Sequence, residues 1–121
     1  PERLFEIFPN LAEMRHRRAS AMSGGEQQML TIARTLMGNP EAVLLDEPSE
    51  GLAPVIVEQM ADAVLRMKAE GIAVLVSEQD LDFAAAVADR ALILEKGAVR
   101  WEGPIATLEA DEDIRRAYLT V

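Results

Sequence analysis

Two short apolar runs, each followed by acidic or amide side chains, constrain the fold of this 121-residue chain more than any other feature. The first is Ala42-Val43-Leu44-Leu45 and the second is Ile72-Ala73-Val74-Leu75-Val76. Short continuous apolar runs are typical of strands in a parallel sheet that is covered on both faces. A helical pattern lies between the runs, so the sequence predicts a βαβ unit within an α/β fold. Ligands of such sheets bind beyond the carboxyl ends of the strands.

Amphipathic helices are predicted on both sides of the first run. One begins at Ser23, which can cap it together with Glu26 in a capping box, and it ends at residues 38–40. The other begins at Pro54 and ends at Gly71. Helical spacing predicts two buried faces, formed by Met29, Ile32, Ala33, Leu36 and Met37 in the first helix and by Ile56, Met60, Ala63, Val64 and Met67 in the second.

The remaining segments complete a predicted order of helix, strand, helix, strand, helix, hairpin and helix. They are an irregular helix within residues 1–18 that is broken near Pro9, a short helix over 81–88, a hairpin formed by 91–95 and 98–101, and a tail helix from Asp111. A basic cluster at residues 15–18 is either a solvated helix end or a docking face for a partner.

Composition excludes several classes of function. The formal net charge of −9 makes the surface repel phosphate backbones, so no binding to nucleic acid is expected. The chain has no cysteine, which excludes disulfides and thiolate metal sites. No apolar run approaches the roughly 20 residues that cross a bilayer, and no signal peptide is visible. The first residue is proline rather than methionine, so we expect a piece of a longer protein.

The segment Ser23-Gly24-Gly25 indicates an anion site. Each glycine costs roughly 1 kcal/mol relative to alanine in a helix, and glycines leave the backbone N–H groups of the first turn uncovered. Such N–H groups, at the positive end of the helix dipole, bind anions. The alternative is an ordinary capped helix start.

Polar side chains follow both predicted strands. Asp46 and Glu47 come directly after the first strand, where one acid can hold a hydrated magnesium ion and the other can deprotonate a water molecule. Ser77-Glu78-Gln79-Asp80 follows the second strand, and a shared sheet would bring Gln79 near the acid pair. The alternatives are a solvated strand end for the acids and an ordinary strand-to-helix turn for 77–80.

These motifs resemble the ATP-binding subunits of ABC transporters, in the family's order and spacing and over essentially the whole chain. Residues 22–26 resemble the signature motif, and Val43-Leu44-Leu45-Asp46-Glu47 resembles the Walker B strand with its adjacent glutamate. Gln79 stands at the switch-histidine position, and residues 49–54 follow Walker B as the family's D-loop does. Ala53 and Gln79 depart from the usual aspartate and histidine, and in this they are similar to one ATPase subunit of branched-chain amino acid importers.

The resemblance implies a partial P-loop NTPase-like parallel sheet flanked by helices, with a C-terminal β-hairpin and with the phosphate-loop strand missing. The chain would be the C-terminal half of a nucleotide-binding domain, with a signature and helical part at 1–38 and a Walker B, switch and hairpin part at 39–121. The pattern Gly-x-x-x-x-Gly-Lys-Ser/Thr does not occur in it. The isolated chain is therefore expected to be inactive as an ATPase. Its open strand edges would be closed by rearrangement, by strand exchange in a homo-oligomer or by pairing with a separate N-terminal fragment.

Site roles also follow from the resemblance. Glu47 would be the catalytic base, Asp46 would hold Mg²⁺ through water, and Gln79 would take the switch position. Ser23, Gly24 and Gly25 would contact the γ-phosphate of ATP bound to the opposite subunit, and Glu26 completes this nucleotide-binding segment in place of the usual glutamine. A carboxylate facing phosphate would be repelled, so Glu26 is expected to turn back to the N–H of Ser23.

The implied partners are a second ATP-binding subunit, in a homodimer or heterodimer, and transmembrane permease subunits. The implied cofactors are ATP and Mg²⁺, and the implied location is cytoplasmic, peripheral on the inner face of the cell membrane. Two other functions stay open: a soluble ABC ATPase of repair or translation, and a non-catalytic module or fragment that binds a partner ATPase.

Overall fold

The structure is a computed structural model that describes residues 2–9, 12 and 24–119. It divides into two compact units, residues 1–80 and 81–121, which are described here one at a time. The basic cluster at 15–18 and the capping residue Ser23 lie outside the described residues, so the predictions made for them stay predictions.

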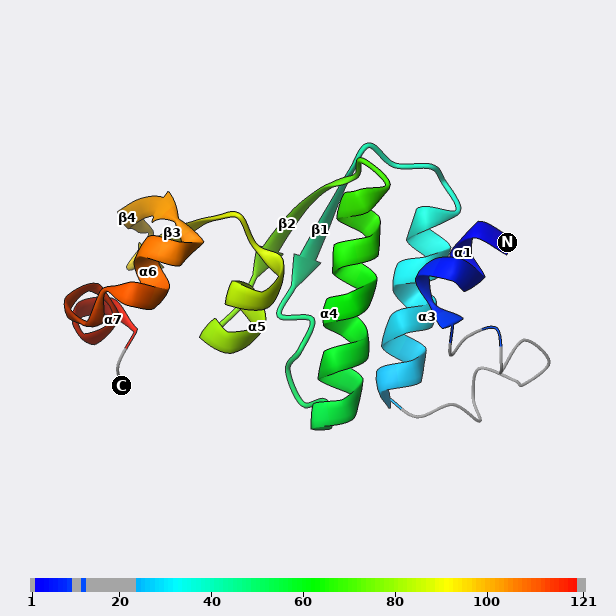
Figure 1. The fold of residues 1–121 in the computed structure, drawn as a ribbon, viewed down its shortest axis with the longest axis horizontal. Helices are drawn as coiled ribbons and strands as arrows, with labels where there is room; N and C mark the ends of the chain where they lie inside the picture. Colours follow the sequence, from blue (N-terminus) through cyan, green and yellow to red (C-terminus); the bar gives the residue numbers. More distant parts are fainter. Residues whose placement is uncertain (1, 10–11, 13–23, 120–121) are drawn as a thin grey trace. The chain divides into compact units, whose positions relative to one another are not determined.

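The first unit contains the predicted βαβ arrangement (Figure 1). Its elements are α1 (Glu2–Ile7), α3 (Gly24–Leu36), β1 (Ala42–Asp46), α4 (Pro54–Ala69) and β2 (Ala73–Ser77). Strands β1 and β2 pair in parallel, from Ala42 opposite Ala73 to Asp46 opposite Ser77. The carboxyl ends of both strands therefore lie side by side, which confirms the α/β prediction and brings the two polar segments to the same edge.

Turn chemistry accounts for the limits of the two long helices. Helix α3 ends before Asn39, which has a φ of 52°, and α4 is followed by Gly71 with a φ of 86°. Positive φ stops a right-handed helix, and glycine adopts it without steric cost. Pro54 opens α4 because its missing N–H would have no partner in the first turn. These boundaries lie within a few residues of the predicted ones.

The core of the first unit lies between the helices and one face of the sheet. Its members are Ile7, Phe8, Met29, Ile32, Ala33, Leu36, Val43, Leu45, Met60, Ala63, Val64 and Met67. The prediction was wrong for Met37, which is 62% exposed because α3 has ended before it. It was also wrong for Leu44, which is 75% exposed. Alternate residues of a strand face opposite sides, and Leu44 points away from the helices that cover Val43 and Leu45.

Strand β2 shows the same one-sided burial. Leu75, opposite Leu44, is 60% exposed, so the expected full burial of both strands is not found. A continuous apolar run predicts a sheet covered on both faces, whereas the described elements of the first unit cover only one.

The second unit is built around a hairpin. Its elements are α5 (Leu81–Val87), β3 (Arg90–Glu95), β4 (Ala98–Pro104), α6 (Ile105–Ala110) and α7 (Glu112–Tyr118). Lys96 and Gly97 both have positive φ, which suits the tight turn of a two-residue hairpin. The hairpin prediction is confirmed, with a register irregularity between Ile93 and Leu94. Ile93, Ile105 and Leu108 form a buried cluster in this unit, and Phe83 and Val87 of α5 are buried as well.

Two helices close the described chain. Helix α7 begins as predicted: the side chain of Asp111 accepts hydrogen bonds from the backbone N–H groups of Asp113 and Ile114. Helix α6 was not predicted, because six residues are too few to show a helical period. No helix among the described residues has the length and hydrophobicity needed to cross a membrane.

The strands form two separate sheets. Within the described residues β1 pairs with β2, β3 pairs with β4, and no ladder joins the two pairs.

Candidate functional site

The acid pair lies at the end of β1, where the sequence analysis placed it. Asp46 is the last residue of the strand and is exposed, and the hydroxyl of its register partner Ser77 donates a hydrogen bond to its Oδ1. A hydrated magnesium ion is usually held by one or two carboxylates together with phosphate oxygens. An exposed carboxylate at a sheet edge fits that requirement. No group of three or more His, Cys, Asp or Glu side chains among the described residues is arranged to bind a metal ion by itself.

Glu47 is held in an uncommon backbone conformation. Its φ is 46°, which costs on the order of 1–3 kcal/mol for a residue other than glycine. Its N–H donates to the carbonyl of Ser77 at 2.7 Å. Its side-chain Oε1 accepts a hydrogen bond of 2.8 Å from Nε2 of Gln79. The predicted proximity of Gln79 to the acid pair is therefore found, and the contact is direct.

The pKa of Glu47 lies above its ordinary value. The main cause is a hydrogen bond with the side chain of Glu50, followed by the negative charge of that residue. Partial burial and the charge of Asp46 act in the same direction, while the hydrogen bond from Gln79 acts against them. A raised pKa makes the carboxylate a stronger base than an ordinary glutamate. No role was predicted for Glu50 from the sequence. Its position three residues after Glu47 was the only sequence signal for this contact.

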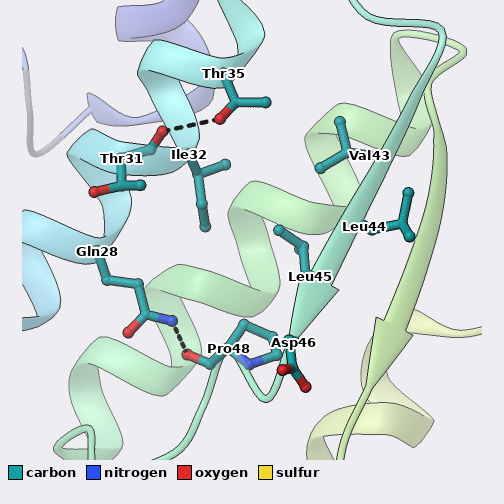
Figure 2. Close-up of a pocket in the computed structure, with 9 residues that line it drawn as sticks. All are labelled: Gln28, Thr31, Ile32, Thr35, Val43, Leu44, Leu45, Asp46 and Pro48. Atoms are coloured by element: carbon teal, nitrogen blue, oxygen red, sulfur yellow. Dashed lines mark hydrogen bonds between the residues drawn. The ribbon is translucent and has the colours of Figure 1, made fainter.

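A side chain from α3 reaches the loop that follows β1. Nε2 of Gln28 donates a hydrogen bond of 2.7 Å to the carbonyl of Pro48, directly after the acid pair (Figure 2). Gln28 also lines a pocket of about 170 Å³ between α3 and β1, with Thr31, Val43 and Asp46 among its neighbours. The loop that carries the acids is thus tied to the helix that begins at the glycine pair.

A second tie comes from the segment after β2. Oε1 of Glu78 accepts a hydrogen bond of 2.8 Å from the backbone N–H of Ser49, and its Oε2 accepts one of 3.3 Å from the N–H of Asp80. Sequence reasoning assigned no contact to Gln28 or Glu78. The only signal was position: Glu78 adjoins Gln79, and Gln28 lies one helical turn after Gly25.

The two glycines at the start of α3 differ in their surroundings. Gly24 is exposed, and a Cβ atom there would meet nothing within 4 Å. Gly25 is buried, and a Cβ atom would lie 2.5 Å from Cγ2 of Ile56 in α4. Gly25 therefore has a packing role, the close approach of two helices, that the anion-site interpretation did not include. Glu26 is half-buried, and its predicted contact with Ser23 involves a residue outside the described part.

Comparison with known proteins relates this arrangement to a family. The sequence pattern described as ABC transporter matches residues 4–50. The high-affinity branched-chain amino acid transport ATP-binding protein BraG of Pseudomonas aeruginosa is 44% identical over 118 residues, a match that covers 98% of this chain and 51% of that protein. The lipopolysaccharide export system ATP-binding protein LptB of Haemophilus influenzae is 32% identical, with 98% and 48% covered. The phosphonates import ATP-binding protein PhnC 2 of Nostoc sp. is 37% identical, with 83% and 41% covered.

Solved structures agree with these sequence matches. The ADP conformation of MJ1267, an ATP-binding cassette of an ABC transporter, superposes with a TM-score of 0.82 at 29% identity, over 98% of this chain and 48% of that one. The chain belongs to the ABC transporter family. A dimeric post-hydrolysis state of the ATP-binding cassette MJ0796, bound to ADP and Pi, matches with a TM-score of 0.63 at 30% identity, over 71% of this chain and 37% of that one.

The chain spans about half the length of the curated relatives that it matches. The relatives are named for different cargoes: branched-chain amino acids, lipopolysaccharide and phosphonates. Family membership alone therefore does not identify the transported solute.

Proposed function

We propose that this chain supplies the signature segment and the Walker B acids of an ATP-hydrolysing subunit of an ABC transporter. The observation that supports this most directly is the contact between Glu47 and Gln79. A carboxylate with a raised pKa, at the carboxyl end of a parallel strand, accepts a hydrogen bond from an amide of the neighbouring strand's loop. A base in this position can orient a water molecule and take its proton.

Each site residue has a distinct proposed role. Glu47 takes the proton of the attacking water, and Gln79 fixes the direction of its carboxylate. Asp46 would hold Mg²⁺ through water, and the ion would supply positive charge for the phosphates of ATP. Phosphoryl transfer depends mainly on positioning and charge stabilisation, so fixed side chains of this kind are what the reaction requires.

The start of α3 is proposed to act on a nucleotide held by a second ATP-binding subunit. The set consists of Ser23, Gly24, Gly25 and Glu26, of which Gly24 is the exposed glycine. Backbone N–H groups at a helix N-terminus attract phosphate oxygens, and the absence of a side chain at Gly24 leaves them accessible. The dimeric cassette with ADP and Pi supports a two-subunit arrangement for this protein as well.

For the cargo we propose branched-chain amino acids, because the 44% identical relative is named for that transport. Transmembrane permease subunits would carry the solute, and this subunit would lie on the cytoplasmic face of the membrane. Uptake of labelled leucine, labelled phosphonate and an unrelated labelled amino acid, by a transporter whose subunit contains residues 1–121, tests this assignment. Uptake of phosphonate but not of leucine would contradict it.

The central test is Glu47→Gln in a full-length subunit that contains residues 1–121. The amide cannot accept the proton, so we expect ATP turnover to fall by about 100-fold or more while nucleotide binding persists. Turnover is measured by phosphate release and binding by fluorescence of a labelled nucleotide. Glu58→Gln, an identical change on the exposed side of α4, is the control. Unchanged turnover in Glu47→Gln would remove Glu47 from the mechanism.

A non-catalytic module that binds a partner ATPase is the second candidate, favoured by the lack of a phosphate-loop pattern in the 121 residues. We expect the isolated chain to release no phosphate from ATP, because the groups that cradle the phosphates are not part of it. Mixing it with a fragment that carries the phosphate loop separates the two functions. Restored turnover that is lost with Glu47→Gln supports the enzyme, and binding without turnover supports the module.

A further inference from the structure

Glu78 joins two loops that are far apart in the sequence. One carboxylate oxygen accepts the N–H of Ser49, 29 residues away, at 2.8 Å, and the other accepts the N–H of Asp80 at 3.3 Å. Ser49 is 8% exposed and is a buried polar residue of the first unit. A hydrogen bond from a backbone N–H to a charged carboxylate is stronger than one between neutral groups. Removing the Glu78 carboxylate would leave the backbone N–H of the buried residue Ser49 without this hydrogen-bond acceptor.

The two contacts of Glu78 flank the proposed catalytic pair. Ser49 lies two residues after Glu47, and Gln79 follows Glu78 directly, so the bridge spans both sides of the Gln79–Glu47 hydrogen bond. The contact with Asp80 is local and occurs in many turns. The contact with Ser49 is different, because it fixes the loop after β1 against the loop after β2.

We propose that Glu78 is a positioning residue that holds Glu47 and Gln79 in register for hydrolysis. The inference rests on the proposed function of Glu47 as the base. Glu78 acts through the backbone of Ser49, because its carboxylate accepts hydrogen bonds from the backbone N–H groups of Ser49 and Asp80. Its required property is an acceptor oxygen at the right distance, since the partner is a neutral N–H group. Its charge adds strength to the bond without taking part in the reaction.

Because only an acceptor oxygen is required, Glu78→Gln is an informative variant. In Glu78→Gln the side-chain carbonyl still accepts from Ser49, and the N–H of Asp80 loses its acceptor because the second atom is now a donor. In Glu78→Ala both contacts are lost. A small displacement of a catalytic group costs up to about 100-fold in rate, so we expect kcat to fall about 10- to 100-fold in Glu78→Ala, with KM changed less than about twofold. We expect Glu78→Gln to retain at least about a third of the wild-type kcat.

Amide hydrogen exchange of Ser49 gives a readout that does not depend on turnover. Measured by NMR on residues 1–121, it is expected to accelerate about tenfold or more in Glu78→Ala, while Glu78→Gln stays near wild type. Glu58→Ala and Glu58→Gln provide matched controls on the exposed surface of α4. Circular dichroism of each variant checks that the fold persists. If Glu78→Ala does not fold, Glu78→Asp takes its place, since its shorter side chain moves the acceptor away from Ser49.

The outcomes separate this inference from the function on which it rests. Loss of kcat in Glu78→Ala, rescue by Glu78→Gln and faster exchange at Ser49 would support the positioning role. If Glu47→Gln abolishes turnover but Glu78→Ala keeps a normal kcat, the positioning role is wrong and the proposed function stands. An equal loss in Glu78→Gln and Glu78→Ala would also overturn it, because charge would then matter more than the acceptor. Unchanged turnover in Glu47→Gln would instead overturn the proposed function, and the positioning role with it.

Discussion

At the scale of single residues, the site depends on backbone positions as much as on side-chain chemistry. Glu47 has a left-handed backbone that turns the chain directly after β1, so that its side chain meets Gln79. Gly24 and Gly25 adjoin in the sequence but differ in function: one is open to solvent and the other is covered by α4. From residue type alone, both glycines were predicted to leave the backbone N–H groups open to an anion.

Gly25→Ala is expected to destabilise the chain, whereas Gly24→Ala is not. A Cβ atom at position 25 would lie 2.5 Å from Ile56, and overpacking of this kind costs about 1–3 kcal/mol. A Cβ atom at position 24 meets no neighbour, so the change there stays within about 1 kcal/mol. Urea unfolding of both variants measures the difference. Equal stability of the two variants would show that α3 and α4 do not pack as described.

Glu50→Gln is expected to lower the pKa of Glu47, because Glu50 provides the largest contribution to its rise. Carboxyl NMR titration of Glu47 in metal-free buffer measures this. The raised pKa means that Glu47 stabilises the fold fully below its unfolded pKa, and this contribution is lost as the pH rises through the folded pKa. In Glu50→Gln the stability contribution of Glu47 should be smaller, and it should be lost at a lower pH. A Glu47 pKa that stays the same would exclude Glu50 as the main cause.

At the scale of elements, much of the fold could be predicted from periodicity and turn residues. Helices α3 and α4, both parallel strands and the hairpin are found within a few residues of the predicted limits. Their signals are local: apolar spacing, Pro54 at a helix start, and Gly71 and Gly97 at positive φ. Helix α6 gave no such signal because it is short, and Met37 was misassigned because α3 ends one residue earlier.

The candidate site was predictable only in part, because some of its contacts depend on loops rather than on strands. Asp46, Glu47 and Gln79 follow strands directly, and parallel pairing fixes where such residues lie. The contacts of Gln28 with Pro48 and of Glu78 with Ser49 depend on the path of a loop. No periodicity specifies a loop backbone, so these ties could be found only in three dimensions.

Gln28→Glu is expected to weaken the attachment of α3 to the acid-bearing loop. A carboxylate cannot donate to the carbonyl of Pro48, and a partly buried acceptor that loses its donor costs about 1–3 kcal/mol. Thermal and urea unfolding measure the loss. Gln28→Met removes the same donor without adding a charge and serves as the control. A loss in Gln28→Glu that Gln28→Met does not share would mean that the added charge, and not the lost hydrogen bond, is responsible.

At the scale of the whole molecule, the sheet of the first unit has a face that no other described element of that unit covers. Leu44 and Leu75 lie opposite each other on it and are 75% and 60% exposed. The chain spans about half of its curated relatives, and its strands show the apolar composition of strands covered on both sides. We therefore expect this face to be covered in a full-length subunit.

Leu75→Gln tests that expectation. In residues 1–121 the side chain is already in contact with water, so the free energy of unfolding should change by less than about 0.5 kcal/mol. In a full-length subunit the same change should cost about 2 kcal/mol or more, because an amide would be buried in an apolar layer. Unfolding midpoints of both proteins measure the contrast. A small effect in both would show that this face stays exposed.

The close approach of Gly25 to Ile56 has a consequence for how this protein family can diversify. A methyl group at position 25 is accommodated without displacement only where position 56 carries a smaller side chain, so position 25 is constrained while Ile56 is kept. Among natural homologues we therefore expect the two columns of an alignment to covary, with alanine at the first accompanied by alanine or serine at the second.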